Sequence, residues 1–192
     1  MAESSQRVTL SATLGTVSTP SRLAALATAA AEGDQRALGD LLREVQPAVW
    51  RLCKALGSPT DPDDLTQDAL LAFVRALPRW RGDGSVLAYA LVIARRTCAD
   101  NVRRRYRHRR LTTRLEAERT SDSHLDHDAH DVHDLLAALD GDRREAFVLT
   151  QVVGLTYEEA AEVADVPVGT IRSRVARARA DLLTAHRNID AV

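Results

Sequence analysis

The sequence is poor in the residues that form tight turns, disulfides and large aromatic cores. Its 192 residues include 9 glycines, 6 prolines and 2 cysteines, and aromatic side chains make up 4% of the chain. So few glycines and prolines disfavour a fold of many short strands joined by tight turns, and two cysteines are too few for a disulfide framework. The core must be built mainly from leucine, alanine and valine, of which the first two favour helices.

Long apolar runs are missing as well. No stretch approaches the length of a bilayer span, and the N-terminus lacks the basic and then apolar order of a signal peptide. We therefore expect no membrane insertion and a location in the cytoplasm. The chain also lacks a Gly-rich phosphate loop, a Cys/His metal quartet and a nucleophile–base pair, so we expect neither an enzyme nor a bound cofactor or metal.

Apolar residues recur at helical spacing along most of the chain, which predicts an all-α fold. We expect two small helical domains joined by a flexible acidic linker, the second containing a helix-turn-helix. The predicted parts are a flexible tail at 1–21, a first domain at 22–107, a linker at 108–131, a second domain at 132–186 and a C-terminal tail at 187–192. Cys53 and Cys98 lie within apolar helical patterns, where free cysteines behave as small buried hydrophobes.

Several helix boundaries follow from the residues that break helices. Pro47 predicts a kink in the second helix or a start after a bend, and Pro78 ends the helix that follows the turn at 57–62. The next helix is predicted from Val86 to about Arg105. In the second domain, one helix is predicted from Arg143 to Val153, closed by Gly154.

Charge is unevenly distributed, although the net charge is only -1. Between Leu91 and Leu115 there are nine arginines and one acid, Asp100, whereas 116–134 holds seven acids and one arginine. A dense basic block is the electrostatic signature of a polyanion partner, although a solvated helix face gives the same pattern. Lys54 is the only lysine among 26 basic residues, a preference that a GC-rich genome also produces.

The C-terminal third carries the most specific pattern. Thr156-Tyr-Glu-Glu159 has the form of a capping box, and Asp165-Val-Pro167 suits a turn with left-handed backbone before a new helix. One sector of that last helix, predicted from 168 to about 185, carries Ile171, Val175, Ala178 and Leu182. The opposite side is rich in arginine. This arrangement fits the major groove of DNA, and an ordinary amphipathic helix with a solvated face is the simpler alternative.

Both halves of the chain resemble the extracytoplasmic-function (ECF) sigma factors. The C-terminal resemblance is carried by Arg144-Glu-Ala-Phe-Val-Leu, Gly154-Leu-Thr-Tyr-Glu-Glu-Ala-Ala161 and Pro167-Val-Gly-Thr-Ile-Arg-Ser-Arg-Val-Ala-Arg-Ala-Arg179. The N-terminal resemblance is carried by Ala30-Ala-Glu-Gly-Asp34, Asp63-Asp-Leu-Thr-Gln-Asp68, Pro78-Arg-Trp-Arg-Gly-Asp83 and Ile93-Ala-Arg-Arg96. It covers roughly residues 22–186, with both motif sets in the family's order, and it suggests a GC-rich source such as an actinobacterium.

The resemblance implies a subunit of bacterial RNA polymerase, monomeric within the holoenzyme, that directs the core enzyme to promoters and helps to open them. The first domain would dock on the β′ clamp helices and read the -10 element, and the second would lie near the β flap and read the -35 element as duplex DNA. An anti-sigma factor is an expected further partner.

The resemblance also assigns residues by position. The polymerase-docking face would comprise Asp63, Asp64, Leu65, Gln67 and Asp68. The -10 contacts would come from Arg79, Trp80, Arg81, Gly82, Arg95, Arg96, Asn101, Arg103 and Arg104. The -35 contacts would come from Thr170, Arg172, Ser173, Arg174 and Arg177. An arginine groove beside an aromatic loop is what capture of a single strand requires.

Some interpretations stay open at this level. Tyr89-Ala90 and Arg96 depart from the common family pattern within the predicted -10 region. Trp80 fits either an exposed loop contact or a core aromatic. Four histidines of the acidic segment could pair around a divalent ion, although a pH-sensitive linker is simpler: His124, His127, His130 and His133. The main rival function is a transcription regulator whose N-terminal domain senses a signal or dimerises.

Overall fold

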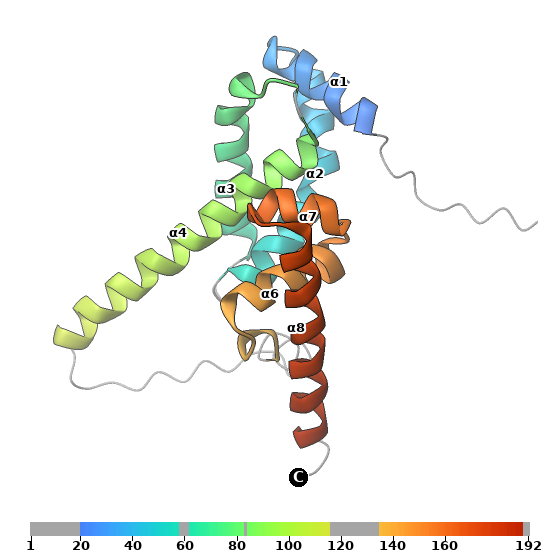
Figure 1. Ribbon diagram of the computed structural model, residues 1–192. Helices are drawn as coiled ribbons and strands as arrows, with labels where there is room; N and C mark the ends of the chain where they lie inside the picture. The colour runs from blue at the N-terminus through green and yellow to red at the C-terminus, as the bar shows by residue number, and fades with distance from the viewer. Residues whose placement is uncertain (1–19, 58–61, 83, 116–134, 190–192) are drawn as a thin grey trace, which may run out of the picture.

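In the computed structural model, every regular element of the described residues is helical, as the sequence predicts (Figure 1). The described residues are 20–57, 62–82, 84–115 and 135–189. The acidic segment with its four histidines falls outside these ranges, so the predictions about the linker stay predictions. None of the described helices combines the length and the apolar character that crossing a bilayer requires.

The N-terminal domain is formed by four α-helices and one 3-10 turn. They are α1 (Pro20–Ala31), α2 (Gln35–Leu56), α3 (Pro62–Ala76), η1 (Leu77–Arg79) and α4 (Val86–Leu115). Asp34 caps α2 by accepting hydrogen bonds from the backbone N–H groups of Arg36 and Ala37, at 2.8 and 3.1 Å. Pro47 lies inside α2 on its exposed side, and the helix continues through it. Pro78 ends the α-helical part of this segment, as predicted.

Helices α2, α3 and α4 pack against one another around a core that is largely aliphatic. Its fully buried members include Leu41, Val45, Leu52, Phe73 and Leu91. The ring of Phe73 meets the edge of Tyr89 at 6.2 Å between centroids, and the Tyr89 hydroxyl donates to the Ala76 carbonyl at 3.1 Å. Together these contacts hold the end of α3 against the start of α4, and so fix both ends of the loop between them.

Cys53 of α2 and Cys98 of α4 lie side by side in this core as free thiols. Their sulfur atoms are 3.8 Å apart, and both side chains are buried, as predicted. The Cys98 thiol donates a hydrogen bond to Cys53, and together with burial this raises the pKa of Cys98 above its ordinary value. The same hydrogen bond lowers the pKa of Cys53, and the two buried side chains form a contact between α2 and α4.

Helix α4 is longer than the sequence pattern predicts. The prediction ended it near Arg105, but the helix runs to Leu115, into the segment that was assigned to the linker. Its C-terminal half projects away from the body of the molecule (Figure 1). The prediction failed because it relied on an apolar period, whereas arginine and leucine favour a helix without one and no glycine or proline interrupts this run.

The C-terminal domain starts with a short helical stretch at 135–137. It continues with α6 (Gly141–Phe147), the π-helical segment η2 (Val148–Val153), α7 (Tyr157–Ala164) and α8 (Val168–Ile189). The sequence predicts one α-helix over Arg143–Val153, but its second half is wound as a π-helix. Four of the six residues of η2 are buried: Val148, Leu149, Thr150 and Val153.

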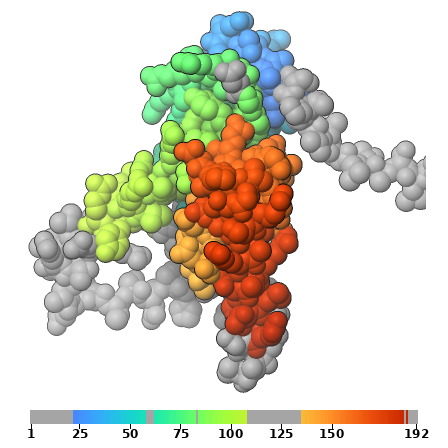
Figure 2. Space-filling model, viewed as in Figure 1, coloured from blue at the N-terminus to red at the C-terminus, as the bar shows by residue number. Residues whose placement is uncertain are grey.

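The two domains are in direct contact. Helices α2 and α4 of the first touch η2 and α7 of the second, and the C-terminal domain lies against the N-terminal one in the space-filling view (Figure 2). The Arg51 guanidinium donates to the Val153 carbonyl at 3.4 Å, and Arg95 forms an ion pair with Glu145. This packing brings α4 beside the helix-turn-helix domain.

Candidate nucleic-acid interface

The predicted helix-turn-helix is formed by α7, a tight turn and α8. The Thr156 hydroxyl accepts a hydrogen bond from the Glu159 N–H at 3.2 Å, and the Glu159 carboxylate accepts one from the Thr156 N–H at 2.9 Å. Both halves of the predicted capping box are therefore present. Asp165 follows α7 with a φ of 56°, the left-handed conformation that the prediction assigned to this turn.

We expect Thr156→Ala to lower the free energy of unfolding by about 0.5–2 kcal/mol, because the Glu159 N–H would lose its side-chain acceptor. Urea unfolding followed by circular dichroism measures this loss. Thr184→Ala is a matched control, because the Thr184 hydroxyl only donates to the Ala180 carbonyl within α8. Equal losses in the two variants would show that the cap contributes nothing specific.

The apolar side of α8 is packed inward as predicted. Ile171, Val175 and Ala178 are buried and Leu182 is half-buried. On the other side Arg172, Ser173 and Arg177 are exposed, while Thr170 is half-buried and its carbonyl accepts a hydrogen bond from the Ser173 hydroxyl at 2.9 Å. An exposed polar face on the helix that follows a capped helix and a tight turn can enter a major groove.

Not all arginines of α8 are equally available. Arg174 forms an ion pair with Asp142 of α6, and Arg179 donates to the Gln151 side-chain oxygen at 2.8 Å. Arg172 lies over the Tyr157 ring, with 5.8 Å from its Cζ to the ring centroid. Sequence reasoning missed these partners, because each lies on another helix and helical periodicity carries no signal for pairs between helices.

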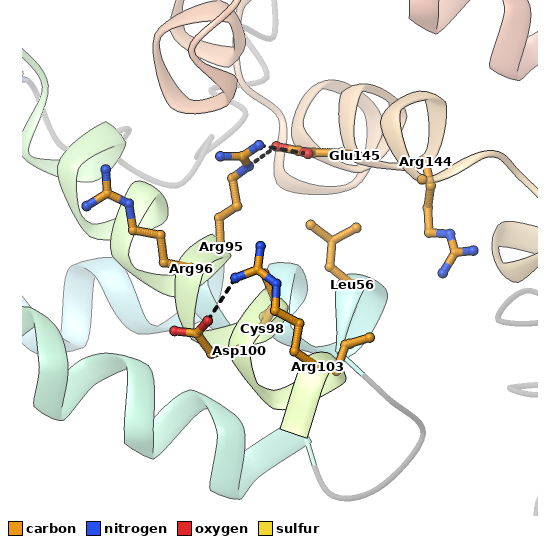
Figure 3. Close-up of a pocket in the computed structure, with 11 residues that line it drawn as sticks. Leu56, Arg95, Arg96, Cys98, Asp100, Arg103, Arg144 and Glu145 are labelled. Carbon is orange, nitrogen blue, oxygen red and sulfur yellow. Dashed lines mark hydrogen bonds and ion pairs between the residues drawn. The ribbon is translucent and has the colours of Figure 1, made fainter. Parts of the chain in front are cut away.

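The arginines of α4 line a cleft between the two domains, with a volume of about 650 Å³ (Figure 3). Arg95 points toward Glu145 of α6 and pairs with it, whereas Arg96 points away from Glu145 (Figure 3). Arg103 pairs with Asp100 one turn earlier, at 3.1 Å. Of the predicted -10 residues on α4, Arg96, Arg103 and Arg104 are exposed, while Arg95 and Asn101 are half-buried.

The loop that precedes α4 carries the other predicted -10 residues. Arg79, Arg81 and Gly82 are exposed, and Gly82 has a φ of 83°, which a residue with a side chain rarely adopts. Trp80 is half-buried, and its ring packs against the core. Its Nε1 is buried and finds no acceptor among the described residues. The structure therefore places much of this ring beneath the loop.

The predicted docking residues do not form one continuous face. Asp63, Asp64 and Gln67 line a groove of about 470 Å³ between α2 and α3, together with Trp50 and Leu71. The Trp50 Nε1 donates to the Asp63 carboxylate at 2.7 Å. By contrast, Asp68 faces a hollow beside α4, and Leu65 is only 4% exposed. Leu65 belongs to the core and has little surface to offer a partner.

Arg144 of α6 has a structural role that the family motif did not predict. Its guanidinium donates to the carbonyls of Ala137 and Leu139, at 2.7 and 3.2 Å, and so holds the end of the 135–137 helical stretch. Burial lowers the pKa of Arg144 below its ordinary value.

Among the described residues, no three His, Cys, Asp or Glu side chains are grouped as metal ligands would be.

Comparison with known proteins matches each domain to a family. The Sigma-70 region 2 family matches residues 41–108, and the Sigma-70, region 4 family matches residues 129–182. The chain is 40% identical over 176 residues to the ECF RNA polymerase sigma factor SigC of Mycobacterium tuberculosis, a match covering 88% of this chain and 93% of that protein. It is 34% identical over 176 residues to the RNA polymerase sigma factor CnrH of Cupriavidus metallidurans, covering 82% and 90%.

Solved structures agree with the sequence comparison. CnrH in complex with the cytosolic domain of CnrY superposes with a TM-score of 0.70 at 32% identity, covering 87% of this chain and 98% of that one. The sigma factor RpoE of Bartonella quintana, in complex with the anti-sigma factor NepR, gives a TM-score of 0.66 at 27% identity, covering 78% and 96%. The chain therefore belongs to the ECF RNA polymerase sigma factors, which recognise promoters and initiate transcription.

Proposed function

We propose that this sigma factor reads promoters at two points with separate parts of its surface. The exposed face of α8, with Arg172, Ser173 and Arg177, contacts the -35 element as duplex DNA. This face is the observation that carries the proposal. Its exposed arginines lie on the helix that follows a capped helix and a turn, which is the arrangement that reads bases in the major groove. Arg174 and Thr170 have secondary roles, since Arg174 is paired with Asp142 and Thr170 is half-buried.

The -10 element is bound by α4 and the loop before it. Arg96, Arg103 and Arg104 track the phosphates. Arg95 joins them at the cleft between the domains, and Asn101 joins them at the hollow that Asp68 faces. Arg79 and Arg81 flank Trp80, and Gly82 follows them, so cationic side chains lie on both sides of the place where a base would be captured. Because Trp80 is partly buried, base capture there requires its indole to turn outward.

Two apolar grooves support docking on core RNA polymerase. The groove between α2 and α3, with Asp63, Asp64 and Gln67 on its rim and Leu71 exposed, suits the β′ clamp helices. Asp68 contributes negative charge at the neighbouring surface. In the C-terminal domain a second groove of about 570 Å³ suits the β flap, and its apolar lining comprises Leu135, Leu136, Phe147, Leu182 and Leu183. Exposed apolar grooves of this kind mark protein contacts.

We further propose that the chain acts in the cytoplasm as a non-catalytic monomer within the holoenzyme, and that an anti-sigma factor restrains it. The similar RpoE forms a complex with the anti-sigma factor NepR, and the similar CnrH forms one with the cytosolic domain of CnrY. The test of the whole proposal is reconstitution with core RNA polymerase and promoter DNA. Core association and specific initiation are expected. Binding to duplex DNA without core association would favour a transcription regulator instead.

We expect Arg177→Ala to weaken binding of the holoenzyme to its promoter by about 1–3 kcal/mol, because an exposed guanidinium loses its contact with a base edge. Selectivity should relax at a single position of the -35 element, which a panel of base substitutions measures. Arg187→Ala is the matched control, since Arg187 is exposed on the same helix about 15 Å further along. Uniform weakening at every position would assign Arg177 to a phosphate instead.

A further inference from the structure

The contact between Arg172 and Tyr157 joins the two helices of the helix-turn-helix. We propose that Tyr157 is a positioning residue for promoter recognition: its ring holds the Arg172 guanidinium at the exposed face of α8 and leaves the N–H donors free for the -35 element. This inference rests on the proposed -35 contact of Arg172. It assigns a function to a side chain of α7, the helix that precedes the reading helix.

The position of Tyr157 is itself fixed by its surroundings. It is the first residue of α7, directly after Thr156, whose reciprocal hydrogen bonds with Glu159 set the start of the helix. The ring is half-buried and packs against the core of the domain. A ring anchored in this way has little freedom to lose when a guanidinium rests on it, so the cost of ordering Arg172 is reduced before DNA arrives.

The other arginines of α8 show why an aromatic partner matters. Arg174 and Arg179 are held by the side-chain oxygens of Asp142 and Gln151, which occupy guanidinium donors. Arg172 is exposed and forms no ion pair within the described part of the chain. Its Cζ lies over the Tyr157 ring at 5.8 Å from the centroid, within the range of a cation–π contact. Such a contact uses the face of the guanidinium, and bidentate recognition of guanine uses its edge.

The experiment is a double-mutant cycle on the full chain in the holoenzyme, with a promoter fragment that contains the -35 element. Tyr157→Leu keeps an apolar side chain without an aromatic ring, and we expect it to weaken binding about two- to fivefold. Tyr157→Phe keeps the ring and should bind like the parent. In the Arg172→Ala background, Tyr157→Leu should cause no further loss, because the group it positions is absent.

A second readout needs no DNA. In the parent and in Tyr157→Phe, the Arg172 Hε resonance should carry a ring-current shift in the NMR spectrum, and Tyr157→Leu should abolish it. Thermal unfolding of each variant separates this effect from a loss of stability, since a positioning role predicts unfolding temperatures close to that of the parent.

Three results would overturn the inference, and they can be told apart. If Tyr157→Phe binds as weakly as Tyr157→Leu, the hydroxyl contacts DNA directly. If Tyr157→Leu is equally costly with and without Arg172, the ring acts independently of the arginine. If Arg172→Ala has no effect on binding, the proposed -35 contact of Arg172 fails and the positioning role fails with it, while reconstitution with core polymerase still tests the function of the chain as a whole.

Discussion

Leu71→Asp is expected to weaken association with core RNA polymerase roughly 30-fold, a free-energy cost of about 2 kcal/mol or more. Leu71 is 49% exposed on α3, at the groove between α2 and α3. A large apolar side chain in such a groove is a natural centre for a protein contact, and a carboxylate there would have to be desolvated on binding. Competition with a labelled sigma factor for a fixed amount of core enzyme measures the change.

The exposure of Leu71 keeps this test free of folding effects. A substitution at a half-solvated position should leave the unfolding temperature close to that of the parent. Ala25→Asp provides the matched control, because it also adds a carboxylate at an exposed apolar position, on α1 rather than at the groove. If Leu71→Asp associates with core polymerase as the parent does, the docking surface does not lie between α2 and α3.

Phe73→Ala is expected to have the largest effect on stability, about 3–5 kcal/mol of the free energy of unfolding. The Phe73 side chain is only 1% exposed and is among the largest fully buried groups. Its removal leaves a cavity between α3 and α4 and also removes the edge contact with Tyr89. Since small proteins are stable by about 5–15 kcal/mol in total, this is a large share.

Urea unfolding monitored by circular dichroism checks this prediction. Phe147, the chain's other phenylalanine, is half-buried beside the groove of the C-terminal domain, so Phe147→Ala should cost clearly less. If the two variants lose the same stability, packing between α3 and α4 is looser than the structure implies. If the proposed -10 surface binds a single strand, that binding should fall together with stability in Phe73→Ala, because Tyr89 holds the start of α4 against the end of α3.

The helix-turn-helix could be predicted from the sequence because its signals are local. A capping box spans four residues, and the turn at Asp165 and the apolar sector of α8 depend only on neighbours along the chain. The extension of α4 to Leu115 was missed because a solvated, arginine-rich helix has no apolar period to detect. Local pattern therefore predicts where packed helices form, and it underestimates helices that leave the core.

The candidate site was only partly predictable. Family motifs identified the candidate contact residues. They could not distinguish Leu65, which is buried, from its exposed neighbours Asp64 and Gln67. The partners of the arginines were also invisible, because Asp142 and Glu145 are brought to Arg174 and Arg95 by tertiary packing. These pairs depend on how α6 lies against α8 and α4, which no spacing within one helix encodes.

The ion pair between Arg95 and Glu145 has a consequence for how binding responds to salt. An unpaired arginine that reaches a phosphate displaces condensed counterions, and each such contact steepens the fall of log affinity against log salt concentration by about 0.7–0.9. To make its proposed contact with a phosphate, Arg95 must first leave Glu145, and the carboxylate it vacates attracts cations from solution. Part of the ion release at the DNA is therefore cancelled by ion uptake at the protein. Arg95 should add less to the salt dependence of promoter binding than Arg104, whose guanidinium is exposed on the same helix.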